Sequence, residues 1–169
     1  MARYFRFEPF STLNPTLNNT AYGWMIGEFS LFRNGARIDW PDGTSNRVTT
    51  VGGSFNTNNN SRKGNLANNK TDDPNNGTVA GTLERFFMLM SPSYAQIDAG
   101  ENVEFDAYGF WSAAGGGYDT RLPTGWRVWI SQDGSSWELL DARADMDDEL
   151  TPAEYTLQGP WNVTRKFRS

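Results

Sequence analysis

The alternation of hydrophobic and polar residues along this chain predicts β-strands. Within 126–131 every second residue is large and apolar, which is the period of a strand that buries one face. Asp133 and Gly134 follow as a tight turn, because Asp tolerates the geometry and Gly adopts positive φ at no steric cost. We expect the chain to return as a strand at 136–140 and to bring Trp137 beside the first strand.

The same pattern recurs between turn residues along the rest of the chain. In the first strand, Phe5 and Phe7 lie on one side and Tyr4 and Arg6 on the other. Asn34-Gly35 is a strong hairpin signal, and Pro41 and Gly43 favour a second reversal. The strands that we expect are 4–10, 24–33, 36–40, 95–100, 103–109, 126–131, 136–140 and 155–161.

Three segments depart from this pattern. The apolar run 83–90 predicts a central strand between sheet layers, with a partner-facing edge strand as the alternative. The polar segment 52–81 is long for a structureless loop, which indicates a functional or mobile segment. The Gly-rich segment 110–120 predicts a loop that carries Trp111 and Tyr118.

Composition supports a single all-β domain that spans residues 1–169. Aromatic residues make up 14% of the chain, and 17 Gly and 8 Pro separate short apolar runs, as in a β-sandwich or barrel. A chain of 169 residues is long enough to bury a core without staples. No stretch predicts a membrane span or a signal peptide, so we expect folding in a bacterial cytoplasm.

Charge and residue types exclude several classes of function. The net charge is -5 and the sequence pI is about 4.7, so the long-range field repels nucleic-acid phosphates. The chain has no Cys and no His, which excludes disulfides, thiolate metal sites and catalysis by Ser-His-Asp or Cys-His groups. Carboxylates are plentiful, but none stands in a recognisable catalytic pair, so we expect no enzyme activity.

An ordered set of residues in 121–141 resembles the discoidin-like domains, also known as coagulation-factor C-type domains. Their fold is a galactose-binding-like jelly-roll β-sandwich, which this resemblance implies here. The matching residues are Arg121, Pro123, Trp126, Ser131, Asp133, Gly134, Trp137, Leu140 and Asp141. The pattern is much less specific for a ligand than for the fold, because this fold hosts many unrelated binding tasks.

The order of the segments resembles a permuted form of this domain. In the commoner arrangement the strands similar to 4–7 and 26–29 come last, whereas here they come first. This order is similar to that of bacteriophage structural and tail-associated proteins. The resemblance therefore implies a virion protein.

The resemblance also implies a structural calcium ion. In the family, a Glu on a strand often joins an Asp- and Thr-containing loop around calcium, a hard cation that takes six to eight oxygen ligands. The matching positions are Glu28, Asp72 and Thr78, and Asp73 and Asn75 are nearby oxygen donors. The doubled Asp and the inserted Pro depart from the family spacing.

A sugar-binding patch is a second hypothesis. Such a site needs an aromatic ring whose face meets the C–H side of a sugar, and polar groups that bind hydroxyls. The loops at one end of the sandwich supply candidates for both, although each aromatic alone is more typical of a core. The candidates are Asn58, Trp111, Tyr118, Asp119 and Arg121.

These observations predict a non-catalytic domain with one of two roles. The first is a virion structural protein that decorates a head or attaches to a tail through contacts with other virion proteins and with copies of itself. The second is a carbohydrate-binding module that attaches the particle to a host surface glycan. The acidic segment 141–149 predicts a solvated face, because it lacks the fixed Gly and terminal Glu of an EF-hand cation site.

Overall fold

The computed structural model describes residues 1–13, 23–52, 63–69, 86–88, 93–113 and 121–163. These residues form an all-β sandwich, as the period-2 pattern predicts, and contain eleven strands, two short 3-10 turns and no α-helix. Every strand pair in the described part is antiparallel.

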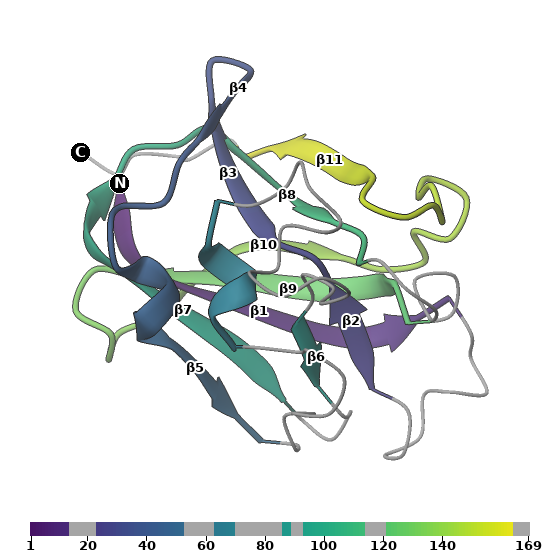
Figure 1. Cartoon of the computed structure of the whole chain (residues 1–169), viewed down its shortest axis with the longest axis horizontal. Helices are drawn as coiled ribbons and strands as arrows, with labels where there is room; N and C mark the ends of the chain where they lie inside the picture. Colours follow the sequence, from purple (N-terminus) through teal and green to yellow (C-terminus); the bar gives the residue numbers. More distant parts are fainter. Residues whose placement is uncertain (14–22, 53–62, 70–85, 89–92, 114–120, 164–169) are drawn as a thin grey trace, which may run out of the picture.

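The larger sheet has five strands in the order β10-β9-β1-β7-β5. The long N-terminal strand lies at its centre, where it pairs with β9 on one side and β7 on the other. Figure 1 shows this layer across the lower half of the molecule. Its strands are β1 (Ala2–Thr12), β5 (Val48–Val51), β7 (Tyr94–Val103), β9 (Pro123–Ser131) and β10 (Glu138–Arg143).

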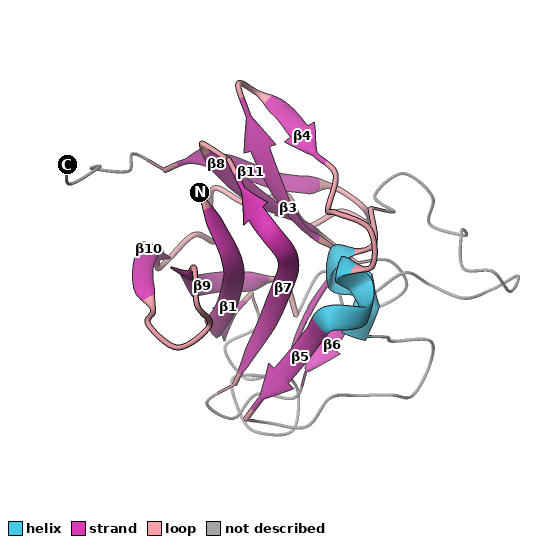
Figure 2. Cartoon of the chain, turned by 90° about the vertical axis from the view of Figure 1, so that its left-hand side faces the viewer, coloured by secondary structure: helices cyan, strands magenta, loops and turns pink. Residues whose placement is uncertain are grey.

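A four-stranded sheet in the order β11-β8-β3-β4 forms the other layer, and a separate two-stranded sheet joins β2 and β6. Figure 2 shows the two 3-10 turns, η2 (Thr44–Arg47) and η3 (Lys63–Ala67), together on one side of the sandwich. The strands of the smaller sheets are β2 (Trp24–Ile26), β3 (Phe29–Arg33), β4 (Ala36–Ile38), β6 (Phe86–Met88), β8 (Ala107–Trp111) and β11 (Leu157–Asn162).

Aromatic rings from both sheets fill the core between the layers. The Phe7 ring on β1 lies at its centre, with its centroid 5.5 Å from that of Phe29 and 5.3 Å from that of Phe110. Trp126 on β9 is fully buried and meets Phe110 edge-on at 5.1 Å. Because aromatic pairs favour such offset and edge contacts, this cluster holds the two sheets at a defined orientation.

A chain of hydrogen bonds also crosses the core. The buried Tyr108 hydroxyl on β8 accepts from Trp126 Nε1 at 2.9 Å and donates to Asp141 Oδ2 at 2.6 Å. Arg143 Nε donates to the same carboxylate oxygen at 2.8 Å. Burial, together with the Asp141 carboxylate, raises the pKa of Tyr108 above its ordinary value, so the hydroxyl stays protonated and links the two sheets.

The strongest local signals are confirmed. Asn34 and Gly35 adopt positive φ values of 52° and 78° and join β3 to β4 as a hairpin. In β9, Trp126, Val128 and Ile130 are buried, as the alternation predicts. The returning strand β10 begins at Glu138, two residues after the predicted start.

The expectation of one strand over 24–33 is wrong. The chain leaves the two-stranded sheet after Ile26 and enters the four-stranded sheet at Phe29. At the junction the Gly27 amide donates to Trp111 O at 2.7 Å, and a Cβ on Gly27 would lie 3.1 Å from Ser112 O. Residues 23–32 are buried on both sides, so periodicity does not mark the point where the chain changes sheet.

Two other boundaries also differ from the prediction. The expected strand 103–109 is interrupted, because Val103 ends β7 and Ala107 begins β8. Val103, Phe105 and Ala107 nevertheless all point inward and are buried, as predicted. Of the run 83–90, the described residues Phe86–Met88 are buried, as expected of a strand between sheet layers. Among the described residues they pair only with β2, in the two-stranded sheet.

Candidate functional site

The structure brings together two residues that the sequence assigned to different sites. Trp111, a predicted sugar-binding residue, donates its amide to the carbonyl of Glu28, the predicted calcium ligand, at 2.7 Å. Trp111 Nε1 donates to Ser30 Oγ at 3.2 Å, and Ser30 Oγ donates to Glu28 Oε1 at 3.4 Å. Trp111 and Glu28 are therefore neighbours, at the end where β8 pairs with β3.

The described residues do not by themselves form the predicted calcium site. Glu28 is buried, and its Oε1 lies 3.2 Å from Arg37 Nη1, so a cation already faces this oxygen. The described part of the chain contains no group of three or more His, Cys, Asp or Glu residues that could hold a metal ion. The other predicted ligands lie outside the described residues, and calcium binding stays a prediction: Asp72, Asp73, Asn75 and Thr78.

Strand β2 and the residue that follows it hold both flanks of the predicted sugar-binding loop. The Met25 amide donates to Arg121 O at 3.0 Å, and the Gly27 amide donates to Trp111 O. The Arg121 guanidinium carbon lies 4.6 Å from the centre of the Phe87 ring, and Arg121 Nε is buried with no hydrogen-bond partner among the described residues. The remaining members of the predicted patch lie outside the described residues: Asn58, Tyr118 and Asp119.

The acidic segment divides into two parts. Asp141 accepts a hydrogen bond from the Tyr108 hydroxyl in the core, whereas the carboxylate side chains between 145 and 149 face solvent. This exposure confirms the predicted solvated face for four carboxylates: Asp145, Asp147, Asp148 and Glu149.

The structure adds a surface to which the sequence assigned no role. We call it the outer face: the solvent side of the five-stranded sheet. In register across this sheet, Arg6 on β1 lies opposite Trp129 on β9 and Gln96 on β7, and Leu139 on β10 lies opposite Trp129. The alternation in β1 predicted that Arg6 points outward, but its neighbours lie far away in sequence.

An arginine held between two aromatic rings lies at the centre of the outer face. The Arg6 guanidinium carbon is 3.5 Å from the centre of the Trp137 ring and 4.4 Å from that of the Tyr94 ring. Arg6 Nε donates to Gln96 Oε1 at 3.0 Å, which fixes the guanidinium plane. We call Arg6, Tyr94, Gln96 and Trp137 the Arg6 stack.

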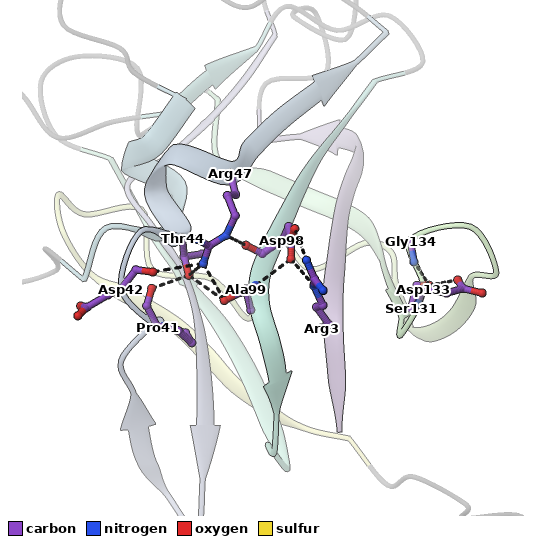
Figure 3. Close-up of polar contacts among 11 residues, drawn as sticks. Arg3, Pro41, Asp42, Thr44, Arg47, Asp98, Ala99, Ser131, Asp133 and Gly134 are labelled. Carbon is purple, nitrogen blue, oxygen red and sulfur yellow. Dashed lines mark hydrogen bonds and ion pairs between the residues drawn. The ribbon is translucent and has the colours of Figure 1, made fainter.

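The turn between β9 and β10 places Trp137 in this stack. Asp133 Oδ1 accepts hydrogen bonds from the amides of Ser135 and Ser136 at 2.8 and 2.7 Å, which lowers the pKa of Asp133. Gly134 adopts a φ of 76° and lies against the Tyr4 ring, and its carbonyl accepts from Trp137 Nε1 at 3.2 Å. Figure 3 shows Ser131, Asp133 and Gly134 of this turn, and Ser131 pairs with Tyr4 of β1.

The carboxylates of the outer face are paired with groups other than Arg6. Asp98 accepts two hydrogen bonds from Arg3 at 2.8 and 3.0 Å (Figure 3), and these bonds lower the pKa of Asp98. Glu8 Oε2 accepts from Trp129 Nε1 at 2.8 Å and lies 3.8 Å from Arg127 Nη1. Loss of hydration lowers the pKa of Arg6, which has no ion-pair partner among the described residues.

Arg47, near the edge of the sheet, has a structural role. Its Nε donates to Asp98 O at 3.0 Å and its Nη2 donates to Ala99 O at 2.9 Å, as Figure 3 shows. These bonds hold the bend at Gly100, where a Cβ would lie 2.6 Å from Arg47 Nη2. Because its Nε and Nη2 donate to carbonyls of the chain, we assign no ligand to Arg47.

No protein-family model, curated protein sequence or solved structure matched the chain. These comparisons therefore add no family and no ligand to what the geometry shows. The described residues contain no helix that is long and apolar enough to cross a membrane.

Proposed function

We propose that the protein is a non-catalytic bacteriophage virion protein, built on a discoidin-like jelly-roll domain, that decorates a head or attaches to a tail. In this proposal it is assembled into particles in the bacterial host cytoplasm, and the outer face contacts other virion proteins. The observation that carries the proposal is the chemistry of this face, where exposed apolar residues lie beside arginines stacked on aromatic rings.

This chemistry is typical of protein–protein contact surfaces. Such surfaces are enriched in Arg, Tyr and Trp and depleted in Lys. Besides the Arg6 stack, Arg3 lies 4.9 Å from the centre of the Tyr4 ring, and Arg127 lies 5.0 Å from that of Phe10. Phe10 and Leu139 are 40% and 46% exposed. None of the described residues of the outer face is a lysine.

The stacking also lowers the cost of binding. An exposed arginine loses side-chain entropy when a partner fixes it, at about 0.5–1.5 kcal/mol for each immobilised long side chain. Two rings and Gln96 already hold Arg6, and the Asp98 carboxylate holds Arg3. Binding of a partner therefore loses less side-chain entropy at Arg6 and Arg3, and the affinity for the partner is higher.

The test is incorporation into particles. Particles are assembled in a host that supplies wild-type protein, Leu139→Arg or Ala36→Arg, and protein content is measured by quantitative mass spectrometry. Ala36→Arg is the control, because Ala36 is exposed on β4 in the other sheet and this variant adds the same charge as Leu139→Arg. Wild type and Ala36→Arg should be present and Leu139→Arg depleted. Absence of wild type contradicts a virion role, and equal incorporation of all three contradicts contact through the outer face.

A carbohydrate-binding role is the second candidate, and the position of Trp111 favours it. The ring is partly exposed, its Nε1 is fixed by Ser30, and β2 with Gly27 holds both flanks of the loop that follows it. In a calorimetric titration with host surface polysaccharide, this role predicts saturable heat that Trp111→Ala abolishes. An absence of heat with the wild-type protein contradicts it.

A further inference from the structure

The Arg6 guanidinium has donors that the described part of the chain does not use. Its Nε is bonded to Gln96, whereas neither Nη atom donates to any described residue. The Arg6 residue is partly exposed, so its side chain is not enclosed by the sheet. A guanidinium that contacts two aromatic rings and is fixed at Nε presents its remaining N–H groups along its own plane.

This geometry suits an anion that presents two oxygens, such as a carboxylate. The centres of the Trp137 and Tyr94 rings lie 3.5 and 4.4 Å from the guanidinium carbon, so these rings already contact the guanidinium. A ligand must therefore approach the edge, where two parallel N–H groups match the two oxygens of a carboxylate. The nearby carboxylates of Glu8 and Asp98 are already paired with other groups, so the ligand comes from outside this face.

The chain carries a surface that is complementary in charge. Asp145, Asp147, Asp148 and Glu149 are exposed within five residues, and we call the segment 145–149 the acidic turn. The Met146 amide donates to Thr124 O at 3.0 Å and the Glu149 amide to Met146 O at 2.9 Å, while the Met146 side chain is buried. The acidic turn is therefore held in shape before any partner binds.

One molecule cannot join these two surfaces to each other. Trp137 directly precedes β10 and the acidic turn follows it, so the six residues of the strand separate them. At about 3.4 Å per residue, this separation is about 20 Å. A contact between them requires two molecules, and in each pair one contributes its Arg6 stack and the other its acidic turn.

We propose that the Arg6 stack of one molecule binds the acidic turn of a second copy, in a head-to-tail contact. The inference rests on the proposed function, because it names the partner of the outer face. Head-to-tail contacts are not self-complementary, so repetition produces rings or open chains of copies.

Sedimentation velocity over a range of protein concentrations tests the contact in solution. Wild type should associate, and added salt should weaken the association. Arg6→Gln and the double variant Asp147→Asn/Asp148→Asn should each weaken it about tenfold or more, because each removes charge-assisted hydrogen bonds. Arg33→Gln is the matched control: it removes the same charge from an exposed pair with Glu104 on the other sheet, and should associate like wild type.

Mixing the variants gives the sharpest test. Arg6→Gln keeps its acidic turn and the acidic-turn variant keeps its Arg6 stack, so together they can form one contact and then stop. A 1:1 dimer in the mixture, with little association of either variant alone, is the expected result. Arg6→Lys keeps the positive charge but loses the two parallel N–H groups, so its association should be weaker than that of wild type and stronger than that of Arg6→Gln. If Arg6→Gln is unstable, this variant distinguishes a binding role of Arg6 from a folding defect.

Several outcomes overturn the proposal. The proposal is wrong if the wild-type protein stays monomeric at every concentration. It is also wrong if Arg6→Gln or the acidic-turn variant associates as strongly as wild type. Monomeric protein that binds polygalacturonate only when Arg6 is present would assign the site to an acidic glycan instead. None of these measurements uses particles, so a failure here is distinguishable from the absence of wild type in purified virions.

Discussion

Removing the Tyr108 hydroxyl should cost a large share of the stability of the sandwich. Tyr108 is fully buried, accepts from Trp126 Nε1 and donates to Asp141, so Tyr108→Phe breaks both bonds and leaves the ring in place. Trp126 is also fully buried, and its indole N–H would keep no acceptor. Asp141 would keep the bond from Arg143 Nε.

The magnitude follows from these two losses. An unpaired buried donor costs about 1–3 kcal/mol, whereas the Asp141 carboxylate, which keeps Arg143, adds less. We therefore expect Tyr108→Phe to lower the free energy of unfolding by about 2–3 kcal/mol, which corresponds to a fall in Tm of about 4–12 °C for a domain of this size.

Urea denaturation followed by tryptophan fluorescence measures this change. Tyr4→Phe is the control, because its ring is partly exposed and its hydroxyl has no described hydrogen bond; it should stay within about 0.5 kcal/mol of wild type. If Tyr108→Phe also stays within that range, the hydrogen bonds across the core contribute little to the stability of the sandwich.

Three further predictions concern acid, packing and metal. Arg3 holds the pKa of Asp98 below its ordinary 3.8, so the Arg3–Asp98 pair contributes its full stability above about pH 4 and loses it as the pH falls through the lower folded-state pKa. Asp98→Asn should therefore reduce the fall in Tm on acidification, and an unchanged dependence of Tm on pH would contradict this. Gly109→Ala should lower the free energy of unfolding by about 1–3 kcal/mol, because the new Cβ would lie 2.7 Å from Gln158 O; urea denaturation equal to that of wild type would contradict the close packing of β8 on β11. The predicted calcium site requires that calcium raise the Tm above its value in chelator and that Glu28→Gln remove the difference; a Tm that calcium does not move counts against the site.

Local signals predicted much of the fold. Alternation predicted the inward face of β1 from Phe5 and Phe7 and that of β9 from Val128, because one side of each strand meets the core. Asn34-Gly35 predicted its hairpin, because few residues adopt two successive positive φ values. These features depend on neighbouring residues alone.

Features that depend on contacts between distant residues could not be predicted from the sequence. The change of sheet at Gly27 depends on Trp111 and Ser112, and the surrounding residues are buried on both sides, which removes the period-2 signal. The Arg6 stack joins residues from β1, β7 and the turn before β10. The one available signal was the outward position of Arg6 in its strand.

The candidate sites were predicted in part. Trp111 and Glu28 came from different motifs, and only their pairing across β3 and β8 shows that they are neighbours. Arg37 follows from no motif, although it faces the Glu28 carboxylate at 3.2 Å. Its place opposite Phe32 depends on the register of the β3–β4 hairpin, which is set by the turn at Asn34-Gly35.

The central claim is that the outer face contacts other proteins of the particle, and cysteine labelling tests it most directly. The chain has no Cys, so Leu139→Cys gives a single reactive thiol on this face and Ala36→Cys gives one on the opposite sheet. The rate of maleimide labelling is compared between free protein and purified particles. We predict that Leu139→Cys becomes strongly protected in particles while Ala36→Cys does not. Equal labelling of Leu139→Cys in both states would contradict the claim.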